Sequence, residues 1–402
     1  MATAPRLFSF PCRVFAPMPI ATPLSLYIHI PWCVRKCPYC DFNSHTAERT
    51  LPEQAYVQAL LADLDQDLPL AEGRAVQTVF IGGGTPSLFS PEAIATLLEG
   101  VATRLPLAPQ AEITLEANPG TAESGKFRGF REAGVNRLSI GAQSFNDRHL
   151  QALGRIHCGQ ETIRAAEMAK AAGFDNFNLD LMFGLPRQTL QEALEDVRTA
   201  LALAPTHISF YQLTLEPNTW FHKHPPPALP GDDALWAMQE DCQALLAGAG
   251  YRQYEVSAYA REGFRCRHNE NYWRFGNYLG IGAGAHGKLT DASGNIARIW
   301  KVRHPARYLE SAGTAASVGG CDSVPADELP LEFLMNHLRL REGFAEAVFT
   351  ERTGLALQAL EPGVSDCIHA GLLERSEGAL RCTNQGWNFL DTVLEAFIPQ
   401  PP

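Results

Sequence analysis

Short apolar runs of strand length alternate with longer segments of helical periodicity through the first 220 residues. The predicted strands are Leu26–Ile30, Thr78–Ile81, Glu112–Glu116, Arg137–Ile140, Asn176–Met182 and His207–Leu213. The clearest helix between them has apolar residues at a 3.6-residue spacing, at Ile94, Leu97, Leu98, Val101 and Leu105. This alternation predicts an α/β fold with right-handed crossovers, in which six parallel strands form a partial barrel that is open on one side.

The pattern changes after residue 220. Phe221–Asp232 is rich in proline and contains His222 and His224. We interpret it as a loop leaving the barrel, with a metal site at the two histidines as the alternative. We expect a helix around Asp233–Leu246 and a strand at Gln253–Val256, followed by irregular structure to about residue 325.

The chain after residue 325 has a pattern of its own. Helical segments are predicted at Glu328–Leu340, Gly354–Leu360 and Asn384–Phe397, with a short strand pair near residues 373–382. Helices with a two-stranded wing resemble a winged-helix module, and a small packing domain is the alternative. The predicted units are an N-terminal extension without fixed structure (1–23), the partial barrel (24–220), a barrel extension (221–325) and a C-terminal winged-helix-like domain (326–402).

Length, charge and cysteine usage narrow the class of protein. A chain of 402 residues is long for one domain, and its 46% apolar content suffices for a packed core. A net charge of −11 argues against a nucleic-acid partner. No run of 18 apolar residues occurs, so we expect no transmembrane segment, which leaves peripheral membrane contact as the remaining option. Ten cysteines without a small-domain framework favour the reducing cytoplasm.

Three cysteines stand together directly after the first predicted strand. Cys33, Cys37 and Cys40 have the spacing Cys-x-x-x-Cys-x-x-Cys. Three thiolates can hold three irons of a cubane cluster and leave the fourth iron open to a small chelating molecule. A closed zinc site would need a fourth protein ligand, for which His45 is the candidate. Two alternatives therefore stay open. One is a zinc site with His45 as the fourth ligand, and the other is three thiols that share no ligand.

A glycine-rich segment and several polar residues follow the other predicted strands. Gly82-Gly83-Gly84-Thr85 comes after the second strand, where a backbone without side chains can approach a ligand closely. Glu116, Gln143 and Asp180 lie at or near the ends of the next strands, and ligands of such folds bind at the carboxyl ends of strands. An aspartate within an apolar strand needs a partner, so a salt bridge between Asp180 and Arg155 is the structural alternative to ligand binding.

The segment from Tyr27 to His45, with the cysteine motif, resembles the radical S-adenosylmethionine (SAM) superfamily. The resemblance extends from about residue 24 to about residue 395. It points to the branch of oxygen-independent coproporphyrinogen III dehydrogenase and the HemW-type haem chaperones. It implies a (βα)6 partial barrel, a [4Fe–4S] cluster on the three cysteines and SAM on the open iron. It places around SAM the residues Tyr27, Tyr39, Gly83, Gly84, Thr85, Glu116, Gln143, Arg155 and Asp180, with Gln212 and His286 as more distant candidates.

Two features separate the branches. The dehydrogenase has a fourth cysteine two residues beyond the third, and this chain has Phe42 there. The string His268-Asn269-x-x-Tyr272-Trp273 resembles the segment that the chaperones use for stable haem binding. An imidazole is a common axial ligand of haem, so His268 is the candidate ligand, with Cys266 as its rival and a structural turn as the alternative.

These features favour a haem chaperone that binds haem as cargo and transfers it to an acceptor protein. An electron donor for the cluster is the second expected partner. Two alternatives stay open. One is the oxidative decarboxylation of coproporphyrinogen III in haem biosynthesis, which would make the chain an enzyme and which Phe42 disfavours. The other is a different radical SAM reaction with an unnamed substrate.

Overall fold

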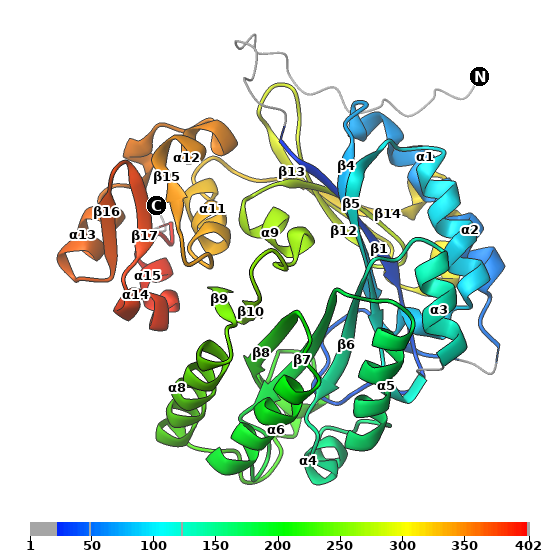
Figure 1. Cartoon of the computed structure of the whole chain (residues 1–402). Helices are drawn as coiled ribbons and strands as arrows, with labels where there is room; N and C mark the ends of the chain where they lie inside the picture. The colour runs from blue at the N-terminus through cyan, green and yellow to red at the C-terminus, as the bar shows by residue number, and fades with distance from the viewer. Residues whose placement is uncertain (1–21, 48–49, 122–123, 400–402) are drawn as a thin grey trace, which may run out of the picture.

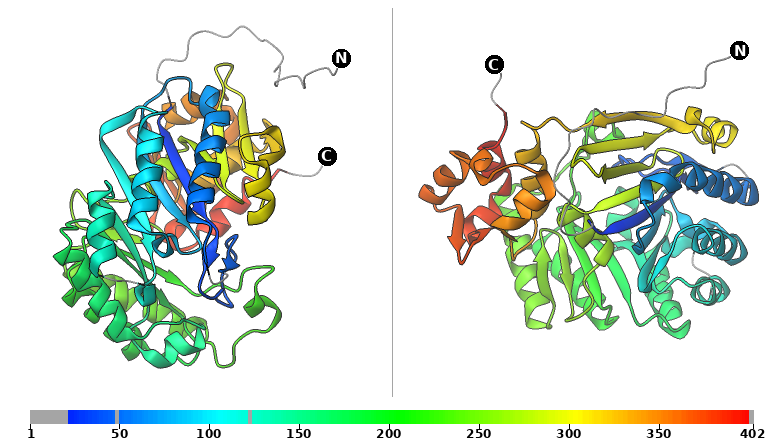
Figure 2. Two further views of the ribbon diagram at one scale, coloured as in Figure 1. Left: turned by 90° about the vertical axis from the view of Figure 1, so that its right-hand side faces the viewer. Right: turned by 90° about the horizontal axis from the view of Figure 1, so that it is seen from above.

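A curved sheet of twelve strands organises the protein in the computed structural model, which describes residues 22–47, 50–121 and 124–399. The strand order is β14-β13-β12-β11-β1-β4-β5-β6-β7-β8-β10-β9. Figure 1 shows helices α1, α2, α3, α5 and α6 along the outer face of this sheet, and Figure 2 shows the same layering from two further directions. All but two residues of the predicted extension at 1–23 lie outside the described residues.

The six predicted strands of the first half are confirmed, and all of them pair in parallel. They are β1 (Leu24–Ile30), β4 (Val76–Gly83), β5 (Leu107–Ala117), β6 (Arg137–Gln143), β7 (Phe177–Phe183) and β8 (His207–Gln212). Most residues of these strands are buried from both sides, as expected of a parallel sheet covered by helices.

The helices of the first half follow the strands in alternation. They are α1 (Glu53–Ala71), α2 (Pro91–Ala102), α3 (Ser124–Glu132), α4 (Asp147–Ala152), α5 (Gly159–Ala171) and α6 (Leu190–Ala202), with single turns η1 (Pro86–Leu88) and η2 (Pro119–Thr121). The predicted apolar stripe is buried, although α2 ends at Ala102 and the last residue of the stripe, Leu105, lies beyond the helix. The start of α2 is fixed by Ser90, whose hydroxyl accepts a hydrogen bond from the Ala93 N–H, and by Pro91 at the first helical position.

The predicted helix at Asp233–Leu246 and the predicted strand at Gln253–Val256 are confirmed as α8 and β9, but the expectation of irregular structure from there to residue 325 is wrong. This part contains β9 (Arg252–Glu255), β10 (Ala258–Ala260), β11 (Asn277–Ile281), β12 (His286–Thr290), β13 (Ile296–Lys301) and β14 (Val318–Ser323). Its helices are α7 (Trp220–Lys223), α8 (Asp232–Gly248), α9 (Arg267–Trp273) and α10 (Pro305–Ser311), with the turn η3 (Ala315–Ser317). The strands are short and carry buried charged residues, so their apolar pattern is weak.

These additional strands extend the barrel sheet at both edges. β11 pairs in parallel with β1, and β12, β13 and β14 follow in antiparallel order, while β10 pairs with β8. Buried ion pairs fix the added strands to the first half, because Lys301 Nζ lies 2.6 Å from Asp63 Oδ1 and 2.8 Å from Asp67 Oδ2 of α1. The partial barrel therefore has more strands than the six that the alternation predicts.

The C-terminal part has a hydrophobic core that is separate from the barrel core. It comprises α11 (Leu329–His337), β15 (Phe344–Ala345), α12 (Glu346–Thr353), η4 (Leu357–Leu360), α13 (Gly363–His369), β16 (Leu373–Ser376), β17 (Ala379–Cys382), α14 (Asn384–Asn388) and α15 (Leu390–Glu395). The helix predicted at Gly354–Leu360 is wrong: α12 ends just before this segment, where Gly354 has φ +72°, and the segment itself contains only the short turn η4. The predicted last helix is broken at Phe389. The winged-helix assignment stays a prediction.

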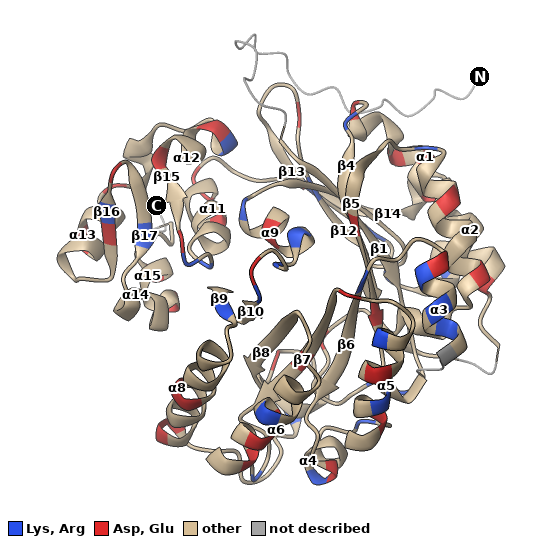
Figure 3. Ribbon diagram, viewed as in Figure 1, with Lys and Arg blue, Asp and Glu red and all other residues tan. Residues whose placement is uncertain are grey.

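Charged residues of both signs are interspersed over the outer helices and the C-terminal part (Figure 3). In the described part of the chain, no helix is long and apolar enough to cross a membrane.

Candidate functional site

The cysteine segment forms a loop at the carboxyl end of β1. Two short strands hold its ends together, because β2 (Trp32–Cys33) pairs in parallel with β3 (His45–Thr46). All three thiols are half-buried. Each has a different polar neighbour: the Thr85 hydroxyl donates to Cys33 Sγ at 3.5 Å, Arg155 Nη1 donates to Cys37 Sγ at 3.5 Å, and Ser44 Oγ lies 3.9 Å from Cys40 Sγ.

The three thiols do not converge as a single metal ion would require. Within the described ranges, no group of three His, Cys, Asp or Glu side chains could hold one ion. Zinc needs its ligands about 2.0–2.3 Å from one centre, whereas a cubane cluster binds each thiolate to a different iron. His45, the candidate fourth zinc ligand, packs on the His304 ring at 5.8 Å and lines another cavity with Trp32. The arrangement fits a cluster better than zinc.

The glycine loop after β4 lies directly beside the cysteine loop. Its N–H groups are all used within the protein: Gly83 donates to Glu116 Oε2 (3.1 Å), Gly84 to the Ile30 carbonyl (2.8 Å) and Thr85 to the Trp32 carbonyl (2.7 Å). In this conformation these three N–H groups have partners within the protein and are not free for a ligand. A ligand that carries an amino group would need the carbonyl oxygens of this loop instead.

Gly83 cannot be replaced by a larger residue without strain. Its φ is +113°, and a Cβ built there would lie 2.5 Å from His29 Cε1. His29 was not predicted as a site residue, although it is a polar residue in an apolar strand. Its Nδ1 accepts from the Tyr27 hydroxyl at 3.0 Å, and its Nε2 donates to the Asn43 carbonyl at 2.8 Å. It thereby connects β1 to the cysteine loop.

Glu116, near the end of β5, and Asp180, in the middle of β7, are two buried carboxyl groups on strands that are separated in the sheet by β6. Burial and the nearby Asp180 raise the pKa of Glu116 to about 8. Burial also raises the pKa of Asp180, which accepts hydrogen bonds from Ser139 Oγ (3.1 Å) and Asn178 Nδ2 (2.7 Å). Arg155 turns instead to Cys37 and to the Gly141 carbonyl. The alternative of an Arg155–Asp180 salt bridge is therefore not found in the described structure.

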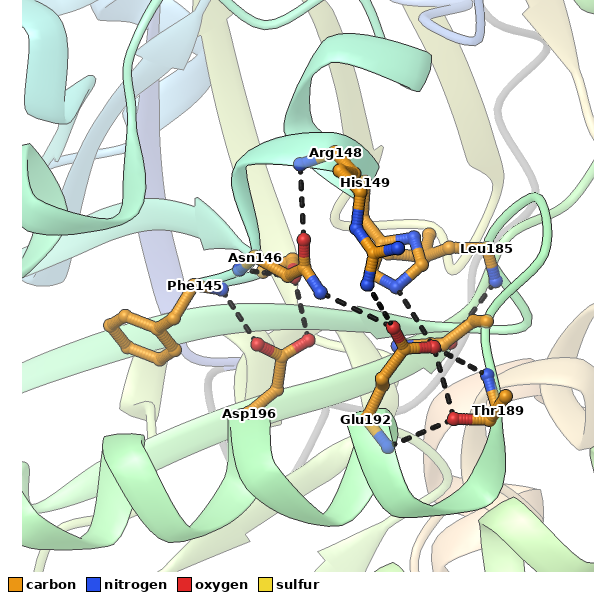
Figure 4. A network of polar contacts seen from close by, with 10 residues as sticks. Phe145, Asn146, Arg148, His149, Leu185, Thr189, Glu192 and Asp196 are labelled. Carbon is orange, nitrogen blue, oxygen red and sulfur yellow. Dashed lines mark hydrogen bonds and ion pairs between the residues drawn. The ribbon is translucent and has the colours of Figure 1, made fainter.

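Gln143 and Arg155 each retain an unused polar atom. Gln143 Oε1 and Arg155 Nε are buried and have no hydrogen-bond partner among the described residues. A buried polar atom without a partner is costly, so both atoms suit a polar ligand. Gln143 also has φ +60°, which is unusual for a residue other than glycine. The residues that follow it are held by Asp196 of α6, which accepts from Ser144 Oγ and Phe145 N at 2.7 Å each (Figure 4).

The two predicted aromatic contacts have different surroundings, Tyr27 on β1 and Tyr39 within the cysteine loop. Tyr27 packs on Phe80 of β4, with ring centroids 6.3 Å apart, and lines a cavity next to the loop. Tyr39 packs on Phe221, at 6.4 Å, within a small separate hydrophobic cluster. Gln212, the more distant candidate, is exposed at the end of β8.

The string at residues 268–273 forms helix α9 on the inner face of the sheet (Figure 1). His268 is 1% exposed, and both its ring nitrogens are engaged, Nδ1 with Thr78 Oγ1 at 2.7 Å and Nε2 with Tyr272 Oη at 2.8 Å. Either nitrogen would have to give up its hydrogen-bond partner to bind iron, so in this conformation the ring does not present a free ligand atom. The alternative of a structural turn is not found either: the segment is a helix, and its Arg267 and His268 N–H groups donate to Glu112.

Cys266, the rival ligand, is also buried. Its thiol lies 3.7 Å from Glu112 Oε1, and burial raises its pKa to about 12. Glu112 was missed by sequence reasoning, because nothing local marks a strand glutamate as the partner of a helix start 155 residues later. The cap places α9 against β4, where His268 packs on Phe80 at 5.1 Å.

A cavity of about 450 Å³ lies beside the cysteine loop, between the inner face of the sheet and helix α11. Such a volume is in the range of small-molecule and cofactor sites. Phe42 lines it from the cysteine loop, and Tyr272 and Trp273 line it from α9. Phe42 and the Tyr272–Trp273 pair are the features that distinguish the chaperone branch from the dehydrogenase branch. They are about 230 residues apart in the sequence and line the same cavity.

Comparison with known proteins agrees with this geometry. Residues 27–200 match the family described as the radical SAM superfamily, and residues 324–389 match the HemN C-terminal domain. The chain is 53% identical to the "Heme chaperone HemW" of Escherichia coli (strain K12), over 94% of this chain and 99% of that protein. It is 50% identical to the protein of the same name from Haemophilus influenzae, over 95% and 100%.

More distant relatives extend the same picture. The "Heme chaperone HemW" of Bacillus subtilis (strain 168) is 35% identical over 93% of this chain and 99% of that protein. Among solved structures, coproporphyrinogen III oxidase (HemN) from Escherichia coli, described as a radical SAM enzyme, superposes with a TM-score of 0.80. That match covers 94% of this chain and 90% of that one at 21% identity, so it shows the fold alone. This chain belongs to the heme chaperone HemW family, on a radical SAM fold.

Proposed function

We propose that this protein is a haem chaperone, which binds haem and transfers it to an acceptor protein. The observation that carries the proposal is the cavity shared by Phe42, Tyr272 and Trp273. Phe42 is 59% exposed and lines this cavity, so its apolar surface is available to a ligand there. The indole nitrogen of Trp273 is buried and has no hydrogen-bond partner in the described structure, so it can donate to a carboxylate.

The radical SAM family implies a [4Fe–4S] cluster and SAM. We propose that Cys33, Cys37 and Cys40 hold the cluster, and the hydroxyl and guanidinium donors at Cys33 and Cys37 would stabilise thiolate charge. When bound, the cluster would supply single electrons at low potential. The unpartnered atoms of Gln143 and Arg155, together with the carboxyl groups of Glu116 and Asp180, support a polar ligand such as SAM beside the cluster.

The remaining proposed SAM contacts surround the same loops. Tyr27, Tyr39, Gly83, Gly84 and Thr85 would complete the SAM site, with the glycine loop offering carbonyl oxygens. We further propose an electron donor for the cluster and residence in the cytoplasm, where a reducing environment protects thiolate ligands. Ligation of haem by His268 stays a prediction, and it requires one ring nitrogen to release its partner, Thr78 or Tyr272.

The decisive experiment combines two assays on one anaerobically reconstituted sample. Haem is titrated against the full chain, and coproporphyrinogen III is then offered with SAM and a reductant. We expect about one haem per chain and no protoporphyrinogen. Turnover of coproporphyrinogen at rates on the order of 1 per second, or slower for a difficult radical step, would replace the chaperone proposal with the dehydrogenase alternative.

A matched pair of variants tests the cavity itself. Phe42→Ala removes an exposed aromatic side chain that lines it, whereas Phe389→Ala removes one of similar exposure, 51%, from the C-terminal part. Phe42→Ala should weaken haem binding roughly tenfold, as expected for the loss of about 1.4 kcal/mol of apolar contact, and Phe389→Ala should not. Equal affinities of the two variants would contradict the proposed location.

A further inference from the structure

The haem site would contain one histidine that is ready to bind iron, and it is not in the string at residues 268–273. Two imidazoles line the cavity, His29 and His286. Both nitrogens of His29 are hydrogen-bonded, to Tyr27 and Asn43. His286 is exposed at the start of β12, and its side chain makes no hydrogen bond within the described residues.

From this arrangement we infer that His286 is the axial ligand of the haem iron, and that Arg303 binds a propionate of the same haem. This inference rests on the proposed function and names the residues that would recognise the cargo.

One face of the His286 ring packs against an aromatic side chain, which limits the positions of the ring. It stacks on Trp300 of the neighbouring strand β13, with ring centroids 6.3 Å apart and an interplanar angle of 25°. Main-chain pairing joins the same two residues, because His286 is the register partner of Trp300. Because the ring is already restricted by this contact, it loses little conformational entropy when it binds a metal.

The charge around His286 suits a porphyrin that carries two carboxylates. Arg298 and Arg303 line the same cavity, and burial together with these two guanidinium groups lowers the pKa of His286. The neutral imidazole is the form that binds metals. Arg298 is paired with Glu332 of α11, whereas Arg303 is exposed and has no ion-pair partner among the residues that the structure describes. Arg303 is therefore the guanidinium that is available for a carboxylate.

The aromatic side chains complete the site. Phe42 and Tyr272 approach the cavity from the cysteine loop and from α9, and apolar faces of this kind pack against a porphyrin ring. In this arrangement Tyr272 serves two purposes, since its hydroxyl also holds His268 Nε2 at 2.8 Å. His268 acts as a positioning residue for Tyr272, and its loss would disturb haem binding indirectly.

The test compares three histidine variants of the full, anaerobically reconstituted chain in ferric haem titrations. His286→Ala should shift the Soret band and weaken haem binding roughly tenfold or more, and added imidazole should restore the wild-type spectrum. His304→Ala is the matched control, because His304 is exposed on the segment after β13 and lines other cavities. It should behave as wild type. His268→Ala should retain the wild-type Soret position, with lower affinity.

Arg303→Gln tests the propionate contact separately. It should weaken the binding of haem but not of haem dimethyl ester, which lacks the carboxylates. Cluster absorbance near 400 nm, measured before haem is added, verifies that each variant is folded. A wild-type Soret band and affinity in His286→Ala, with loss of the band in His268→Ala, would overturn the inference and leave the chaperone proposal intact. Failure of the wild-type chain to bind haem would instead overturn the proposed function.

Discussion

Replacing Gly83 by alanine should damage the site in a way that can be separated from ordinary backbone strain. Gly83 has φ +113°, and an added Cβ would lie 2.5 Å from His29 Cε1 and 2.7 Å from its Nδ1. The ring must move, and its hydrogen bonds to Tyr27 and Asn43 must break. Asn43 also donates to the Ala283 and Arg303 carbonyls at 2.8 Å each, so the displacement reaches the anchor of the cysteine loop.

The magnitude follows from two contributions. An alanine in such a sparsely populated backbone region costs about 1–3 kcal/mol. Two lost hydrogen bonds add about 0.5–1.5 kcal/mol each, giving a total of roughly 2–6 kcal/mol for Gly83→Ala. Gly134 provides a matched control, because its φ is +105° and nothing lies within 4 Å of an added Cβ. Gly134→Ala should therefore cost only the first contribution.

The assay is anaerobic urea unfolding of both variants, followed by the rate at which a chelator removes iron from each reconstituted protein. Gly83→Ala should be less stable than Gly134→Ala by about 1–3 kcal/mol and should lose iron faster. Equal stability losses with equal iron retention would refute the reasoning, because the contact with His29 would then have no energetic consequence.

Three further predictions concern the cluster, SAM and pH. Cys37→Ala should lose the absorbance near 400 nm expected of a thiolate cluster, whereas Cys321→Ala on β14 should keep it; four irons per chain in Cys37→Ala would exclude the assignment. Asp180→Ala should weaken SAM binding by about 1–3 kcal/mol in equilibrium titrations if the carboxyl group contacts SAM, and unchanged affinity would remove it from the site. The pKa of Glu116 is raised to about 8 in the folded protein, from an ordinary value of 4.5, so its protonated form stabilises the fold. This contribution is complete below about pH 4.5 and is lost as the pH rises through about 8. Urea unfolding of wild type should therefore show a larger decline over that interval than unfolding of Glu116→Gln, and parallel pH profiles would contradict the raised pKa.

The alternation of strand-like and helical patterns predicts the six parallel strands of the barrel, and the spacing of three cysteines predicts the cluster motif. The six parallel strands could be predicted because buried strands read as short apolar runs whatever their partners. The order Cys33, Cys37, Cys40 fixes three thiols within one loop, and the glycine loop at residues 82–84 follows its strand directly. Resemblance supplied the roles of the polar residues, which spacing alone could not assign.

Only the tertiary structure decided which of these residues meet, and in what state. β11 joins the sheet beside β1 through backbone pairing that leaves no strong apolar pattern in the sequence. The contact of Arg155 with Cys37 and the cap of Glu112 on α9 join residues more than 100 positions apart. His268 and Tyr272, four residues apart on one helical turn, could equally have faced the cavity or the sheet. In the structure His268 is buried against Thr78, so this face of α9 turns toward the sheet. The sequence alone does not give this rotation about the helix axis, because it depends on the surface on which the helix packs.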